Sequence, residues 1–136
     1  MHPSKTTYLL ATNAQEYRLC HALYRAAEPD GAPIKLGFPT VMASREGALV
    51  GFMSTNTETG QVVAGPLVTD PTIRNTAFLA MRLCEAYEQV LAQAGITSYR
   101  IGVTKSRPQW NQIVKRIGFE PYLETEDSLW LERKIA

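Results

Sequence analysis

Residues 74–94 restrict the fold most, because they combine helical periodicity with apolar side chains over most of the helix surface. Gly95 is well placed as a C-terminal cap, and β-prone stretches at 62–68 and 98–104 flank the helix. A strand, a long helix and a second strand make a βαβ crossover, so we expect these two strands to run parallel. The stripe left for solvent is narrow: Arg82, Glu85, Gln89 and Gln93.

Ahead of this crossover the chain predicts a strand, a helix and an irregular loop. Residues 6–12 favour a short strand, and Asn13 with Glu16 forms a capping box at the start of a helix. The helix is expected to stop at Pro29, and the chain is expected to stay irregular until Val41, because prolines and glycines recur there. This loop could border a substrate site or merely connect two elements.

Three antiparallel strands in succession are expected next. Residues 41–43 and 48–55 predict a hairpin, because two β-compatible runs flank a four-residue connection, 44–47, that ends in glycine. A second turn at 56–60 leads into the strand at 61–68.

The last third of the chain predicts a short amphipathic helix and two strands. Ser106 with Gln109 forms a second capping box, and Gly118 ends the helix. Strands are expected at 119–123 and 128–135, around an acidic turn.

Together these elements predict an α/β (α+β) protein with a mixed, mostly antiparallel sheet, a central βαβ crossover and helices on both faces. A chain of 136 residues has the usual size of one domain, so we expect a single domain over residues 1–136. A composition with 45% hydrophobic and 20% charged residues excludes intrinsic disorder. The net charge of +1 lacks the positive excess that drives nonspecific nucleic-acid binding, so DNA and RNA are not expected as partners.

The cysteines and the N-terminus bear on location and on metals. Cys20 and Cys84 form no C-x-x-C pair, and His2 and His21 add no second set of zinc ligands, so we expect free thiols in a reducing cytosol and no metal site. Residues 1–7 are polar, and no run of about 18 apolar residues occurs. We therefore expect neither export nor a membrane span, and a cytoplasmic location.

The order of elements from the hairpin onward, with Gly118-Phe119-Glu120 after the short helix, resembles the GCN5-related N-acetyltransferase (GNAT) superfamily. The resemblance covers roughly residues 41–135, and the first strand and helix fill the family's variable N-terminal part. It implies an acyl-CoA-dependent N-acyltransferase that moves an acetyl group from acetyl-CoA to an amine of a small molecule or a protein.

In that family the motif Arg/Gln-x-x-Gly-x-Gly/Ala joins the fourth strand to the long helix, and its backbone N–H groups cradle the pyrophosphate of acetyl-CoA. A helix N-terminus suits this role because it offers unpaired donors and the positive end of a dipole. The matching stretch is 74–79, where Ala77 and Leu79 replace the usual small residues, and the bulkier Leu79 could obstruct close approach of the cofactor. Arg74 and Thr76 are also compatible with a surface arginine and a helix cap. The resemblance implies these cofactor-binding residues: Leu67, Val68, Arg74, Asn75, Thr76, Ala77, Phe78, Leu79 and Arg107.

A second family landmark, Asn-x-x-Ala-x-x-x-Tyr-x-x-x-Gly-Phe, maps onto residues 107–119. Val114 stands where the family's tyrosine protonates the departing thiolate, and strand 62–68 carries no glutamate to deprotonate an amine. The catalytic residues are therefore unknown from sequence. His21 is expected to be a partly buried or surface histidine rather than a catalytic base, and Cys84 is expected to lie in the core rather than to act as a nucleophile. Conceivable replacements for the acid are Tyr99, Tyr122 and Ser106.

Two functional hypotheses follow. In the first, the parallel strands splay around the thioester, and a backbone N–H near Leu67 or Val68 polarises its carbonyl while an amine attacks. In the second, a noncatalytic GNAT-fold protein binds and modulates a partner protein through the cleft or through residues 29–39. Small bacteriophage-encoded members of the family have a similar length and similar motif losses, so a viral protein acting in the host cytoplasm is one interpretation. The acceptor and the oligomeric state stay open.

Overall fold

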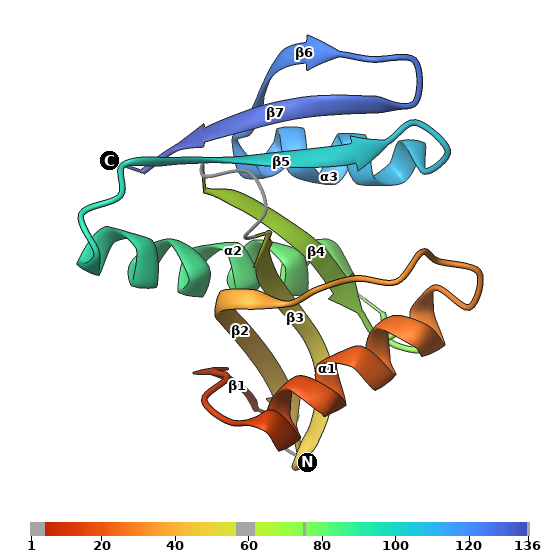
Figure 1. The fold of residues 1–136 in the computed structure, drawn as a ribbon, viewed down its shortest axis with the longest axis vertical. Coiled ribbons are helices and arrows are strands. Elements are labelled where there is room, and N and C mark those ends of the chain that lie inside the picture. The colour runs from red at the N-terminus through yellow and green to blue at the C-terminus, as the bar shows by residue number, and fades with distance from the viewer. Residues whose placement is uncertain (1–4, 57–61, 75, 136) are drawn as a thin grey trace.

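The computed structural model describes residues 5–56, 62–74 and 76–135. Within these ranges, seven strands form one sheet in the order β1-β2-β3-β4-β5-β7-β6, and three helices pack on it (Figure 1). All neighbouring strands are antiparallel except β4 and β5, which are parallel. The elements are β1 (Thr6–Leu10), α1 (Ala14–Ala27), β2 (Gly37–Arg45), β3 (Ala48–Asn56), β4 (Val63–Thr69), α2 (Thr76–Gln93), β5 (Ser98–Thr104), α3 (Pro108–Ile117), β6 (Glu120–Glu124) and β7 (Ser128–Lys134).

The helices cover both faces of the sheet, as predicted. α1 lies on one face, whereas α2 and α3 lie on the other (Figure 1). Successive residues of a strand point to opposite faces, so Met42 packs with Cys20 of α1 while Val41 packs with Leu83 of α2. The predicted mixed sheet with a central crossover is confirmed, and so is its mostly antiparallel pairing.

Helix α2 is the buried helix that the sequence predicts. Its buried side chains include Leu79, Leu83 and Tyr87, which are fully covered. A Cβ atom at Gly51 of β3 would lie 3.2 Å from Leu83 Cδ1 and 3.4 Å from Leu79 Cδ2, so the missing side chain lets α2 sit close to the sheet. The predicted polar stripe is indeed exposed: Arg82, Glu85, Gln89 and Gln93.

The hairpin of β2 and β3 differs from the prediction at two places. β2 begins at Gly37 rather than at residue 41, because the chain through Pro39 is already extended. The pairing of β2 with β3 shifts in register between Gly37 and Val41. The connection contains two residues, Glu46 and Gly47, with φ of 52° and 80°, and not four. Two residues with positive φ form the tight turn that matches the twist of antiparallel strands. The predicted turn at 56–60 lies almost wholly outside the described residues.

The caps of α1 and α3 show one correct and one wrong prediction. Asn13 caps α1 by accepting a hydrogen bond from the Glu16 N–H at 2.9 Å. Ser106 does not cap α3, because its hydroxyl donates to the Thr104 hydroxyl at 3.2 Å and the N-cap position belongs to Arg107. Gly118 does end α3, with a φ of 122°.

Candidate functional site

The parallel strands β4 and β5 part soon after they meet. In the described chain their ladder holds two pairs, Val63 with Arg100 and Ala64 with Ile101. Beyond these pairs β4 turns away from β5, and the divergence is visible in Figure 1. The predicted splayed strands are therefore present.

A bulge in β4 marks the point of divergence. Between Ala64 and Leu67, β4 holds one residue more than the matching stretch of β3, and the bulge contains Gly65 and Pro66. A bulge re-aims a strand, and proline has no N–H with which to continue a ladder. The local sequence Gly65-Pro66 thus explains why the sheet opens here.

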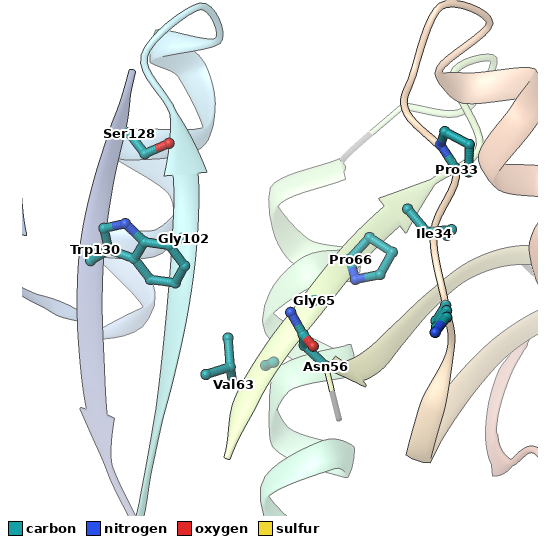
Figure 2. Close-up of a pocket in the computed structure, with 11 residues that line it drawn as sticks. Pro33, Ile34, Asn56, Val63, Gly65, Pro66, Gly102, Ser128 and Trp130 are labelled. Atoms are coloured by element: carbon teal, nitrogen blue, oxygen red, sulfur yellow. The ribbon is translucent and has the colours of Figure 1, made fainter. Parts of the chain in front are cut away.

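On the face that carries α1, the opening widens into a cavity of about 640 Å³, which we call the Trp130 pocket (Figure 2). Gly102, Ser128 and Trp130 form one side, and the loop between α1 and β2 forms the other. The complete lining is Pro33, Ile34, Lys35, Asn56, Val63, Ala64, Gly65, Pro66, Gly102, Ser128 and Trp130.

A smaller cavity of about 200 Å³, the Trp110 pocket, lies in the gap between β4 and β5. Gly65, Pro66 and Gly102 line both this cavity and the Trp130 pocket, so the two meet at residues with little or no side chain. The rest of its lining comes mainly from β5 and α3: Glu28, Leu67, Ile101, Val103, Thr104, Arg107, Trp110 and Val114.

A third cavity of about 210 Å³, the Thr76 pocket, continues toward the start of α2. It shares Glu28, Leu67, Arg107 and Trp110 with the Trp110 pocket. The first turn of α2 offers N–H groups without helical partners and the positive end of a dipole. The three cavities are adjacent through these shared residues, and we call their succession from the Trp130 pocket to this helix end the path.

An ion pair between Arg107 Nη2 and Glu28 Oε2 joins the beginning of α3 to the end of α1. Both residues line the Trp110 and Thr76 pockets, so the pair lies at the side of the path. The two side chains are 42% and 30% exposed, which means that water screens the pair.

Buried hydroxyl groups fix the start of β2 and thereby the loop that borders the Trp130 pocket. Ser54 Oγ accepts from the Gly37 N–H at 3.1 Å and lies 2.7 Å from Thr40 Oγ1. Thr55 Oγ1 donates to the Pro39 carbonyl at 2.8 Å and lies 2.7 Å from the Tyr87 hydroxyl. The loop therefore enters the sheet through a satisfied polar network, which holds its geometry.

Four of the predicted cofactor-binding residues gather along the path, namely Leu67, Val68, Thr76 and Arg107. Arg74 is exposed near the start of α2 and lines none of the three cavities. Asn75 lies outside the described residues.

The other three predicted residues, Ala77, Phe78 and Leu79, also line none of these cavities. Leu79 has no exposed surface and packs in the core, so the prediction that it could obstruct the cofactor is wrong. It fails because position 79 of the helix faces the sheet. Phe78 points outward, and the Arg82 guanidinium carbon lies 5.2 Å from its ring centre.

None of the conceivable replacements for the missing acid lines the three cavities. Tyr99 is 1% exposed and donates a hydrogen bond to Glu88 at 2.8 Å, and burial raises its pKa far above the usual range. Tyr122 lies on the edge strand β6, with the Arg100 guanidinium 4.6 Å from its ring centre. Ser106 is held by Thr104. Val114, at the position of the family's tyrosine, is buried and lines the Trp110 pocket.

The two thiols belong to the core. Cys20 and Cys84 have no exposed surface, and burial raises the pKa of each thiol to about 12. Among the described residues, no three His, Cys, Asp or Glu side chains come together as a metal site. In the same part of the chain, no helix has both the length and the apolar character needed to cross a membrane.

Sequence reasoning missed Glu28, Gly102 and Trp130. A glycine inside an alternating strand is a signal that another group approaches the backbone closely, and Gly102 lies between Ile101 and Val103 in such a strand. The identity of the approaching group depends on the pairing of β5 with β7, in which Gly102 faces Trp130.

No protein-family model and no curated protein matches the sequence. Solved structures match the fold over almost the whole chain. The ribosomal-protein-S18-alanine N-acetyltransferase from Escherichia coli has 14% identity and a TM-score of 0.76, with 97% of this chain and 95% of that chain covered. An aminoglycoside 6'-acetyltransferase type Ii has 17% identity and a TM-score of 0.78, with 96% and 97% covered. An aminoglycoside 6'-N-acetyltransferase complexed with coenzyme A has 14% identity and a TM-score of 0.73, with 97% of each chain covered. At such identities the likeness shows the fold alone.

Proposed function

We propose, from the premise that this chain has the GNAT acetyltransferase fold, that it transfers the acetyl group of acetyl-CoA to a primary amine. The observation that carries the proposal is the opening between β4 and β5, with cavities that meet at Gly65, Pro66 and Gly102. A donor and an acceptor entering from opposite ends would come together there.

The residues around the Thr76 pocket fit the phosphate end of coenzyme A. The first turn of α2 supplies backbone N–H donors, and Arg107 supplies a guanidinium group beside the same cavity. Arg74, which is exposed next to the start of α2 but lines none of the three cavities, adds a positive charge near this helix end. Leu67 and Trp110 give the narrower part of the path an apolar lining that suits the pantetheine chain.

The reaction needs little from side chains. The lone pair of the amine attacks the thioester carbonyl carbon, the new C–N bond forms, and the C–S bond then breaks. A backbone N–H of Leu67 or Val68 stabilises the charge on the carbonyl oxygen. The amine loses a proton to water, and the coenzyme A thiolate takes one from water. The products are an acetamide and free coenzyme A.

Positioning outweighs acid–base chemistry in this arrangement. Holding the two reactants together supplies effective molarities of roughly 10⁵ M or more in favourable cases, whereas acid–base assistance is worth about 10²–10⁴-fold. A transferase with Val114 in place of a proton donor is therefore slow but competent. This proposal needs no catalytic side chain.

Thermal unfolding with and without acetyl-CoA tests the proposal. Ligand at about 100 times its dissociation constant stabilises the folded state by roughly 2.7 kcal/mol, and for a chain of this length this raises Tm by about 9 °C. Arg74→Glu is expected to reduce the shift, whereas Arg18→Glu, an equal charge change on the exposed surface of α1, should leave it unchanged. No shift at millimolar acetyl-CoA would sink the proposal.

Turnover is then followed by the release of coenzyme A with a panel of primary amines. Stabilisation by acetyl-CoA without release of coenzyme A for any amine would instead favour the noncatalytic alternative, in which the same scaffold binds a partner protein. A pull-down with the intact chain would then identify that partner.

A further inference from the structure

The indole of Trp130 lies flat against the backbone of β5. A Cβ atom at Gly102 would be 3.0 Å from Cη2, 3.0 Å from Cζ3 and 3.2 Å from Cε3 of Trp130. Three consecutive ring carbons at nearly equal distances place that point over the face of the ring, because an approach at the edge would bring one carbon much closer than its neighbours. Gly102 therefore lets the ring lie on the strand.

The same indole borders the Trp130 pocket beside the point where the cavities meet. Trp130 is only partly buried and Gly102 is exposed, and Gly102 itself lines both the Trp130 and the Trp110 pockets. Figure 2 shows the ring and Gly102 on one side of the opening, across from Gly65 and Pro66. A ligand that reaches the meeting point from the α1 face passes along an aromatic surface.

The opposite side of this pocket is mainly apolar and is held in place. Pro33 and Ile34 come from the loop whose end is anchored by the Gly37, Thr40 and Ser54 hydrogen bonds. A cavity with an aromatic ring on one side and a fixed apolar segment on the other is preorganised for a flat apolar group.

The charges around the pocket oppose a polycationic ligand. Lys35 is the ionisable side chain among the described lining residues, and no carboxylate lines the cavity in the described chain. A polyamine or an aminosugar carries several positive charges and is best held by carboxylates. A ligand with one amine has the fewest positive charges and so the least conflict with this lining.

From these observations we infer that the acceptor is a small primary amine on a flat aromatic body with one positive charge, an arylalkylamine, whose ring stacks on Trp130. That this amine accepts an acetyl group rests on the proposed function. That the protein binds it rests on the Trp130 pocket alone. The acceptor nitrogen then reaches the meeting point of the cavities, and the group transfer is the one given above.

Calorimetric titration of the intact chain with three amines tests the inference. Phenethylamine has a flat ring, cyclohexylethylamine has an apolar ring of similar size that is not flat, and spermidine is a polycation. Phenethylamine is expected to bind most tightly. In Trp130→Leu, the ratio of the Kd of cyclohexylethylamine to the Kd of phenethylamine should fall by roughly 2- to 12-fold, which is the range that the energies of aromatic pairs correspond to. Trp130→Phe should keep this ratio, because it keeps an aromatic ring.

Gly102→Ala provides a weaker perturbation of the same ring, because the new methyl group would meet the indole at 3.0 Å and shift it by a few tenths of an ångström, so the advantage of phenethylamine should fall less than in Trp130→Leu. Tyr122→Leu, which removes an exposed aromatic ring that lines none of the three cavities, is the matched control and should leave the preference among the amines unchanged. Far-ultraviolet circular dichroism identifies any variant that fails to fold.

The possible failures are distinguishable. Equal affinity for phenethylamine and cyclohexylethylamine, or tightest binding of spermidine, overturns the inference even if acetyl-CoA stabilises the protein and is turned over. Selective binding of phenethylamine that depends on Trp130 supports the inference even if acetyl-CoA has no effect on Tm, in which case only the transfer reaction is lost.

Discussion

Glu28→Gln is expected to strengthen the binding of coenzyme A, although it removes an ion pair from the folded protein. Arg107 is paired with Glu28 at the side of the path, and it must release this partner to bind a phosphate. The substitution keeps the size of the side chain and removes only the negative charge. Arg107 is then available to the ligand without an exchange of partners.

The size of the effect follows from the exposure of the pair. With 42% and 30% of the two side chains exposed, the pair is worth about 0.2–1 kcal/mol, because water screens it. Recovering this energy on binding corresponds to a roughly 1.5- to 5-fold lower Kd for coenzyme A. The gain should shrink at about 1 M salt, where the Debye length is near 3 Å.

Isothermal titration with coenzyme A measures the change directly, and urea unfolding reports any cost in stability. Glu85→Gln is the matched control, because its pair with Arg82 is 49% and 50% exposed and lies on the outer surface of α2. It should leave Kd unchanged. A higher Kd in Glu28→Gln would refute the reasoning, since the ion pair would then hold the path in its binding shape rather than compete with the ligand.

Two further predictions concern pH. No carboxylate or imidazole lines the Trp130 pocket in the described chain, and the Glu28 carboxylate in the Trp110 pocket is paired with Arg107. We therefore expect kcat/KM to rise tenfold per pH unit and to level off at the pKa of the acceptor amine itself. A plateau that stays near pH 6 to 7 for amines of different pKa would reveal a base on the protein. The folded-state pKa of Cys20 and of Cys84 is raised from 9.0 to about 12, so their contribution to stability is complete below pH 9 and is lost as the pH rises toward 12. Urea unfolding at a series of alkaline pH values should show this decline in stability. A thiol reagent at pH 8 should modify the two cysteines only after the protein unfolds. Rapid modification of the native protein would contradict the burial of both thiols.

Sequence patterns predicted the structure correctly where the interacting residues are close together in the chain. The Asn13 cap is a contact between residues three apart, and the buried face of α2 follows from helical spacing alone. The same periodicity is compatible with Leu79 in the core, where it lies. The prediction that Leu79 could obstruct the cofactor came instead from its size at a position where the family motif has a small residue. A motif position carries information about a ligand only if the side chain at that position faces the ligand.

Other features depend on contacts between distant segments. The predicted cap of α3 is wrong because the Ser106 hydroxyl donates to the Thr104 hydroxyl instead of capping the helix. The local sequence pattern does not distinguish between these two contacts of Ser106. The ion pair of Glu28 and Arg107 joins residues 79 positions apart, so it exists only once α1 and α3 lie on either side of the opening. The splayed strands could be anticipated from the resemblance, whereas the stacking of Trp130 on Gly102 required the register of β5 and β7.

The Trp130 and Thr76 pockets have no residue in common, and each joins the middle cavity through its own set of neighbours. Under the proposed function, the residues that select the amine are therefore separate from those that bind coenzyme A. A substitution at Ile34 or Ser128 can change which amine enters while the affinity for the thioester stays as it was. If the proposed function holds, substitutions in the Trp130 pocket alone could exchange the acceptor without rebuilding the residues around the Thr76 pocket.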